Sequence, residues 1–418
     1  MSLPFQLAFE SAARAPLGIR LERGEERGVA KFLLGINYWP RRSAMYMWQR
    51  FDLGEIREDL ARMRELGLQA VRFFLSWEAF QPQADLIDRA ALGRLDGLLD
   101  AVAGAGLRAI PTFFTGHMSG VNWLPEWTLD SATPHGRFRT YCGGAERPYG
   151  IGDMYGGPLL AAQRLQVRTI GERCRDHPAI YAWDLGNEFS NLREPRTPAD
   201  AAQWSKTLAH DLLETSGIAC SAGTHGEDIT FDRNIRPSSL CRPFAFASMH
   251  GYSVYSAFAR GRLDSGVVPF LCRVMQSCAG TPVLFGEFGN PTCPPGAVRP
   301  GASPFACLSE DEMAGYGYAV LDALQRQGAL GGLWWCWADY AGEIADLAPF
   351  DRAPHELTFG IVRGDGSEKP VARMLARFAR EEREVTAPPP PILDESTYFA
   401  GLPGAVESAY RAYLETDG

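Results

Sequence analysis

Lysine is almost missing from this sequence of 418 residues. Only Lys31, Lys206 and Lys369 occur, so arginine carries nearly all of the positive charge. None of the three lysines ends an apolar run of the kind that forms a strand, which leaves a Schiff-base mechanism without a nucleophile. Acidic residues outnumber basic ones, and the formal net charge of -9 disfavours nucleic acid and anionic membranes as partners.

Long apolar runs are absent as well. No uninterrupted stretch approaches the roughly 20 residues that a membrane-spanning helix needs, and Met1–Arg20 lacks the basic start and apolar centre of a secretion signal. The nine cysteines are an odd number, and the nearest pair, Cys272 and Cys278, has no histidines at metal-ligand spacing. These absences predict a cytoplasmic protein with reduced cysteines and with no metal or other cofactor.

The chain does contain a regular alternation of short apolar runs and segments with helical periodicity. Its length and its 46% hydrophobic residues suit one large soluble domain with extensions. Eight runs separated by helices predict a closed (β/α)8 TIM barrel. An open doubly wound sheet would share the alternation, but Gly35–Pro40 is not its glycine-rich fingerprint. The expected strands are 32–38, 69–75, 107–114, 181–185, 218–223, 244–249, 282–288 and 331–337.

The barrel is expected to occupy residues 31–385, between a charged N-terminal lead-in at 1–30 and a C-terminal extension at 386–418. The extension begins with a stiff proline-rich spacer and continues into a short helix that we expect to pack on the barrel. The connection Thr115–Pro158, after the third strand, is rich in glycine, proline and aromatic residues. Because a loop this long in a compact domain is usually functional, we place it beside the site.

Two of the apolar runs end in a glutamate. Tyr181–Phe189 contains the pair Asn187-Glu188, and Pro282–Phe288 carries Glu287 directly after a glycine. A single glutamate after an apolar run is commonly a solvated strand end. Two of them at the C-terminal ends of barrel strands, where barrel enzymes hold their active sites, fit the cleavage of a glycosidic bond by an acid and a nucleophile.

With its other strand-end residues, the chain resembles glycoside hydrolase family 5, a family of retaining (β/α)8 glycosidases. The resemblance covers residues 32–382 and implies the (β/α)8 barrel with Glu188 as acid/base and Glu287 as nucleophile. An acid needs a raised pKa, whereas a nucleophile needs hydrogen-bond donors that keep it ionised. The other residues that carry the likeness are Arg72, His117, Asn187, His250, Tyr252 and Trp335, with Trp337 as the alternative to Trp335.

The same resemblance implies a role for each of these side chains. Arg72 and Tyr252 would donate to Glu287, and Asn187 would bond the 2-hydroxyl of the sugar. His117 and His250 would bond sugar hydroxyls or orient the glutamates. Trp335 or Trp337 would form a flat apolar floor under the sugar ring.

A narrower likeness points to the substrate. Pro111–Gly120, followed by Asn122-Trp123, is similar to bacterial exo-acting β-mannosidases, as is Asn37–Trp39. It implies release of terminal mannose from an oligosaccharide or glycoside, with His117 and Asn122 near the axial 2-hydroxyl. An endo-β-mannanase or a cellulase-type endo-glycanase is the alternative, and a non-catalytic carbohydrate-binding barrel is a third reading. The sequence gives no prediction of the oligomeric state.

One further cluster raises the possibility of a metal site. His225 lies close to Glu227 and Asp228, but one histidine and two acids on a polar segment are more typical of a turn. The first strand also lacks a His-x-His pattern. We therefore disfavour a metal-dependent hydrolase.

Overall fold

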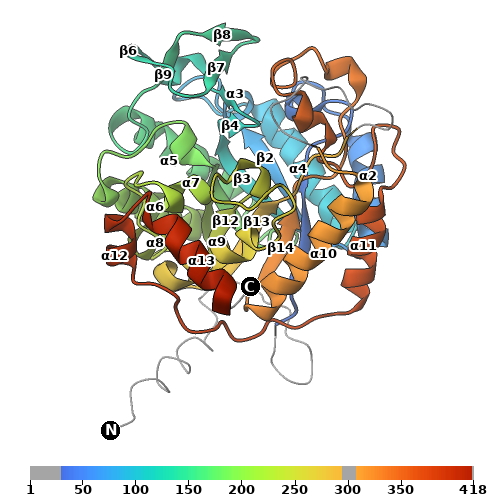
Figure 1. Cartoon of the computed structure of the whole chain (residues 1–418). Helices are drawn as coiled ribbons and strands as arrows, with labels where there is room; N and C mark the ends of the chain where they lie inside the picture. The colour runs from blue at the N-terminus through green and yellow to red at the C-terminus, as the bar shows by residue number, and fades with distance from the viewer. Residues whose placement is uncertain (1–29, 294–306, 417–418) are drawn as a thin grey trace.

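The computed structural model describes residues 30–293 and 307–416, and within them a closed parallel barrel surrounded by helices (Figure 1). The strand order β11-β10-β3-β2-β1-β14-β13-β12 makes neighbours of the first and last strands, β1 and β14. A parallel bridge between His225 and His250 joins the two ends of that order. The prediction of a (β/α)8 barrel is confirmed. Its strands are β1 (Leu33–Tyr38), β2 (Ala70–Ser76), β3 (Arg108–Thr115), β10 (Trp183–Asn187), β11 (Cys220–Gly223), β12 (Ala247–His250), β13 (Val283–Phe288) and β14 (Gly331–Trp334).

The outer layer is a ring of amphipathic helices, each lying between consecutive barrel strands or following the last one. Their starts and ends follow local signals: Asp52 accepts hydrogen bonds from the first backbone N–H groups of α2, and Gly67 ends the segment at φ 79°. Within the described residues, the connection from β11 to β12 uses two short helices instead, and the short helix α3 (Trp77–Phe80) precedes α4. The helices are α2 (Leu53–Glu65), α4 (Arg89–Gly104), α5 (Gly157–Arg173), α6 (Pro198–Ser216), α7 (Gly226–Thr230), α8 (Pro237–Leu240), α9 (Val267–Ala279), α10 (Glu310–Arg326) and α11 (Pro370–Arg380).

The long connection after β3 is not an irregular loop. It folds into a small four-stranded sheet of order β4-β5-β7-β8 and a separate pair, β6 with β9, which Figure 1 shows above one end of the barrel. These strands are only two to six residues long, too short for a periodic pattern to reveal them. They are β4 (His117–Met118), β5 (Val121–Trp123), β6 (Leu129–Pro134), β7 (Arg139–Cys142), β8 (Ala145–Arg147) and β9 (Tyr149–Ile151).

The C-terminal extension lies against the barrel. Arg273 of α9 donates to the carbonyl oxygens of Pro389 and Pro390 in the proline-rich spacer. Two short helices follow, α12 (Glu395–Ala400) and α13 (Ala405–Thr416), and the ring of Tyr410 in α13 lies 5.0 Å from that of Phe270. The expected lead-in at 1–30 falls almost wholly outside the described residues.

The cysteines depart from expectation at one place. Cys293 and Cys307 form a disulfide, so the prediction that the cysteines are reduced is wrong for this pair. They are fourteen residues apart, and no spacing rule singles such a pair out of nine cysteines. The other seven are buried free thiols. Across the described ranges, no helix is both long and apolar enough to cross a bilayer.

Candidate active site

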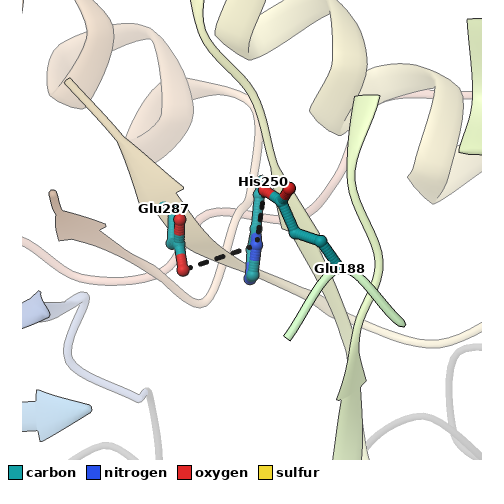
Figure 2. Close-up of side chains that lie close together, drawn as sticks. All are labelled: Glu188, His250 and Glu287. Atoms are coloured by element: carbon teal, nitrogen blue, oxygen red, sulfur yellow. Dashed lines mark hydrogen bonds and ion pairs between the residues drawn. The ribbon is translucent and has the colours of Figure 1, made fainter. Parts of the chain in front are cut away.

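The two strand-end glutamates meet at the C-terminal end of the barrel with a histidine between them. Nδ1 of His250, from β12, lies 3.4 Å from Oε1 of Glu188 and 3.5 Å from Oε1 of Glu287 (Figure 2). One oxygen of each glutamate therefore lies within 4.8 Å of the other. No described group bonds to Nε2 of His250, which is buried, so we place the ring proton on Nδ1, where two carboxyl groups can accept it.

Glu287 is surrounded by hydrogen-bond donors. Arg72 donates to Oε1 at 2.5 Å, and the Tyr252 hydroxyl donates to Oε2 at 2.7 Å, so both bonds expected from the sequence are present. The side chain is 4% exposed. Burial raises the pKa of Glu287, while Arg72 and Tyr252 oppose that rise. Each bond stabilises the ionised form, as a nucleophile requires.

Arg72, on β2, connects three other strands of the barrel, β1, β10 and β13. Its guanidinium donates to Asp184 of β10, to Oδ1 of Asn37 of β1 and to Oδ1 of Asn187, each at 2.9 Å. Its side chain is 2% exposed, so the cation is stable only because two carboxylates, Asp184 and Glu287, accompany it.

Removing this cation is expected to destabilise the fold strongly. Arg72→Met leaves Asp184 and Glu287 buried without their cation, and breaking a buried pair in this way costs about 3–5 kcal/mol. Burial already raises the pKa of both carboxyls, and without Arg72 only neutral hydrogen-bond donors oppose that rise. The loss should therefore be larger at about pH 8 than at about pH 5, because a raised native pKa costs stability once the unfolded group ionises. Urea unfolding at both pH values measures it.

The control is Arg326→Met, which removes a surface cation from its pair with Asp322. The Arg326 side chain is 66% exposed, and such pairs contribute about 0–1 kcal/mol. Equal losses in the two variants, or a loss for Arg72→Met that does not depend on pH, would contradict this account of the buried cluster.

Glu188 follows β10 in a left-handed backbone conformation, with φ 47°. Its N–H is fixed on the carbonyl oxygen of Gly223 at 2.9 Å, and Gly223 permits this approach, since a Cβ there would lie 2.4 Å from the carbonyl oxygen of Gly186. The Glu188 side chain is 16% exposed. Burial, and then the nearby charge of Glu287, raise the pKa of Glu188 well above its usual range. Of the two carboxyls, Glu188 is thus the one whose protonated form is favoured more strongly.

Three neutral histidines flank Glu188. Nε2 of His117 lies 3.9 Å from Oε2 of Glu188, and Nδ1 of His225 lies 3.8 Å from the same atom. Burial lowers the pKa of His117 and of His225 to about 3, and lowers that of His250 well below its usual value. None of them adds a positive charge that would pull the proton from Glu188.

Several predicted residues have positions different from those expected of a sugar contact. Oδ1 of Asn122 accepts from Nδ1 of His117 at 2.7 Å, and its amide donates to the Asn191 carbonyl oxygen, so Asn122 holds the histidine in place. Trp337 is fully buried, and Arg62 of α2 lies 5.7 Å from its ring. Its expected contact with the sugar stays a prediction. Trp335 lies instead beside Phe74, with ring centroids 5.8 Å apart.

Asn187 connects Arg72 to the backbone of His117. Its Oδ1 accepts from Arg72, and its amide donates to the His117 carbonyl oxygen at 3.0 Å. One amide proton remains for a ligand, which is compatible with the expected bond to a sugar hydroxyl.

Four residues of the site were not expected. His225, predicted to lie in a turn, is 6% exposed and faces Glu188. Asn191 donates to Oε2 of Glu188 at 3.1 Å. Asn37 and Asp184 lie inside apolar strands, where a buried polar residue requires partners, and that signal was available in the sequence.

The spacing of Glu188, His250 and Glu287 would also suit a metal ion. The guanidinium of Arg72, bonded directly to Glu287, already supplies the positive charge at that carboxylate. This donor set fits a pair of working carboxyl groups better than a metal site.

Aromatic residues line a cavity of about 320 Å³ above the ends of β1, β2 and β3. Its walls include Trp39, Tyr46, Trp123 and Tyr141. Trp39 stacks on Phe74 at 5.1 Å, and Arg72 lies over that ring at 4.7 Å, so a single aromatic ring separates the cavity wall from the cluster around Glu287.

Parts of this chain are similar to known glycosidases. The model of glycoside hydrolase family 42, described as β-galactosidase, matches residues 45–211. Endoglycoceramidase I of Rhodococcus hoagii is 27% identical over 143 residues, which are 31% of this chain and 28% of that protein. The chain thus spans little more than a quarter of that curated relative.

Solved structures resemble the chain over more of its length. The exo-β-1,4-mannosidase Op5Man5 from Opitutaceae bacterium strain TAV5 has 27% identity and a TM-score of 0.70, over 85% of this chain and 60% of that one. A variant of a GH5_18 protein from Streptomyces cattleya, in complex with Manβ1-4GlcNAc, has 22% identity and a TM-score of 0.74, over 92% of this chain and 91% of that one. The latter likeness shows the fold.

Proposed function

We propose that the chain is a glycoside hydrolase of the clan that includes families 5 and 42. Within that clan it would be a retaining enzyme that removes single mannose units from the non-reducing ends of β-mannosides. Glu188 serves as acid/base and Glu287 as nucleophile. The observation that carries the proposal is the contrast between them. Glu287 accepts from a cation and a hydroxyl, whereas Glu188 is buried among neutral histidines with a raised pKa.

The short distance between the carboxyl groups supports a retaining mechanism. Retaining glycosidases hold them about 5–5.5 Å apart, whereas inverting ones leave space for a water at about 6.5–9.5 Å. Glu287 attacks the anomeric carbon while Glu188 gives its proton to the departing oxygen. A water molecule then attacks the glycosyl ester, Glu188 takes the proton from that water, and the Glu287 carboxylate is released.

A wall over β1 and β2 supports exo action. These strands lie between β3 and β14 in the barrel, and the segments that follow β3 and β14 meet above them. Arg139 of β7 donates to Asp351 at 2.8 Å, Arg352 pairs with Glu146 at 2.8 Å, and Ser119 donates to Glu356 at 3.0 Å. Such contacts close one side of the site, as a pocket for a chain end requires.

The mannose preference draws on the known proteins. The similar structure with 27% identity is named an exo-β-1,4-mannosidase, and the GH5_18 variant was solved with Manβ1-4GlcNAc. An endo-acting β-mannanase is the second candidate. It is favoured by the aromatic cavity beside Trp39, which has room for a further sugar ring.

The early products from mannotetraose distinguish an exo-acting β-mannosidase from an endo-acting β-mannanase. An exo-acting enzyme should release mannose and mannotriose first, because it accepts a single sugar unit on the non-reducing side of the bond that it cleaves. Chromatography at low conversion measures the ratio. Mannobiose as the first product would reject the exo proposal and indicate an open cleft. If the protein hydrolysed no aryl β-glycoside, we would conclude that it is a carbohydrate-binding protein.

Opening the wall should change the products. Arg139→Ala removes the contacts between β7 and the segment after β14, so mannobiose should begin to form from mannotetraose. Arg147→Ala is the matched control, because Arg147 lies on the same insertion but pairs with Glu126 instead. Identical product ratios in both variants would show that the wall does not set the mode of action.

A further inference from the structure

A buried trio lies next to Glu188 without touching the nucleophile. The Ser190 hydroxyl lies 2.5 Å from Oδ1 of Asp228 and 3.0 Å from Nε2 of His225. The other oxygen of Asp228 accepts the backbone N–H of His225 at 3.0 Å. The side chains of His225 and Asp228 are at most 8% exposed, and Ser190 is buried too. The mechanism above assigns no step of the reaction to these three residues.

The hydrogen bonds of the trio define the tautomer of His225. Burial raises the pKa of Asp228 to about 6, so at neutral pH it is a carboxylate and can only accept. Ser190 has one proton and directs it to Asp228. Its oxygen must therefore accept from His225, which places the imidazole proton on Nε2 and leaves a lone pair on Nδ1.

Nδ1 lies near the acid/base, and the His225 side chain also accepts the backbone N–H of Asp228 in the capping box of α7. Nδ1 of His225 lies 3.8 Å from Oε2 of Glu188. His117 presents a second lone pair to the same oxygen: its Nδ1 donates to Asn122, so its Nε2, 3.9 Å away, is unprotonated. An acceptor near a carboxyl group favours its protonated form, because only that form has a proton to offer.

We propose that His225 is a positioning residue whose tautomer, fixed by Ser190 and Asp228, keeps the proton on Glu188. The proposal rests on the assignment of Glu188 as the acid of the reaction. Other titratable and charged groups surround Glu188 and His225. The titratable and charged groups around Glu188 and His225 are Arg72, His117, Arg137, Glu227, Asp228, Arg233, His250, Tyr252, Tyr255 and Glu287.

The substitution Asp228→Asn tests this directly, because it reverses the tautomer without changing the shape of the side chain. The backbone N–H of His225 still needs an acceptor, so the amide oxygen keeps that bond and the NH2 group faces Ser190. Ser190 must then accept from the amide and donate to Nε2 of His225. The imidazole proton moves to Nδ1 and points at Glu188, where it stabilises the carboxylate.

The expected result is a lower pKa for Glu188, by about one unit, which corresponds to about a tenfold change in the protonation equilibrium. The basic limb of kcat/KM for an aryl β-mannoside with a poor leaving group should move to lower pH by the same amount. The ¹³C titration of the Glu188 carboxyl group without substrate gives the same value independently of turnover.

Ser190→Ala is the matched comparison. Nε2 of His225 lies 3.6 Å from Oδ1 of Asp228, so without the hydroxyl the imidazole can donate to the carboxylate and keep its tautomer. The pKa of Glu188 should then stay near the wild-type value. A role in packing alone predicts the opposite order, since the alanine leaves a void whereas the asparagine does not.

A measurement on the unaltered protein completes the test. ¹⁵N spectra should show His225 protonated on Nε2 at neutral pH, and protonation on Nδ1 would overturn the inference even if Asp228→Asn failed to fold. An unchanged Glu188 titration in folded Asp228→Asn would overturn it too. Failure of the wild-type enzyme to hydrolyse any aryl β-glycoside would instead reject the proposed function, while the titrations would still report the tautomer.

Discussion

Glu287→Ala should lose nearly all turnover, by about 10⁴-fold or more, because removal of a nucleophile eliminates the covalent route. The protein itself should stay folded: the variant relieves the buried cluster of one carboxylate, while Asp184 still pairs with Arg72 at 2.7 Å. Steady-state hydrolysis of a dinitrophenyl β-mannoside measures the loss. Glu407→Ala, which removes an exposed carboxylate from α13, should retain full activity.

Azide should restore part of this activity and reveal the role of the residue. The alanine leaves space on the face of the sugar that Glu287 would attack, and a small anion can enter there beside Arg72 and Tyr252. A single displacement from that face inverts the anomeric centre, so the product should be the α-mannosyl azide. A β-azide, or activity that survives the substitution, would assign the nucleophile to another group.

The barrel could be predicted because its signals are local. Each helix has a 3.6-residue period with a cap such as Asp52 or a terminal glycine such as Gly67, and each strand is a short apolar run. Alternation of the two suffices for the architecture. Glu188 and Glu287 were found in the same way, since a carboxylate at the end of an apolar run stands out in sequence.

His225 could not be found this way, because what makes it functional is long-range. Its tautomer is determined by Ser190, thirty-five residues earlier in the chain, and its neighbour Glu188 follows a different strand. In sequence, only its nearness to Asp228 is visible, and that pair also caps α7, as a turn residue would. His225 and Asp228 thus both cap α7 and form part of the site, and the sequence pattern indicated only the turn.

The contacts that form the wall could not be predicted from the sequence either, because they too are long-range. Arg139 and Asp351 are 212 positions apart, and neither lies in a periodic segment that would locate it. The insertion could be recognised as functional from its length and its position after β3. Its contact with the segment after β14 depends on barrel closure, which makes β1 and β2 the only strands between them.

Glu188→Ala should separate substrates by their leaving groups. A dinitrophenolate departs without a proton, so formation of the glycosyl ester should stay fast, whereas a sugar or alkyl leaving group should lose about 10²–10⁴-fold. Hydrolysis of the ester also needs Glu188, as base, so the covalent intermediate should accumulate and appear as a burst of dinitrophenol. Pre-steady-state absorbance measures the burst, and a series of aryl mannosides measures the dependence on leaving group.

Azide again gives the decisive product. In Glu188→Ala the intermediate is still formed on Glu287, and azide attacks it from the opposite face, so the second inversion yields a β-mannosyl azide. The two variants should therefore give azides of opposite configuration from one substrate, which a shared loss of folding could not produce.

The raised pKa of Glu188 predicts one more difference between the wild type and this variant. The basic limb of the wild-type pH profile should disappear in Glu188→Ala, because that limb reports the loss of the Glu188 proton. Equal losses for good and poor leaving groups, or a basic limb that persists, would assign the acid to another residue.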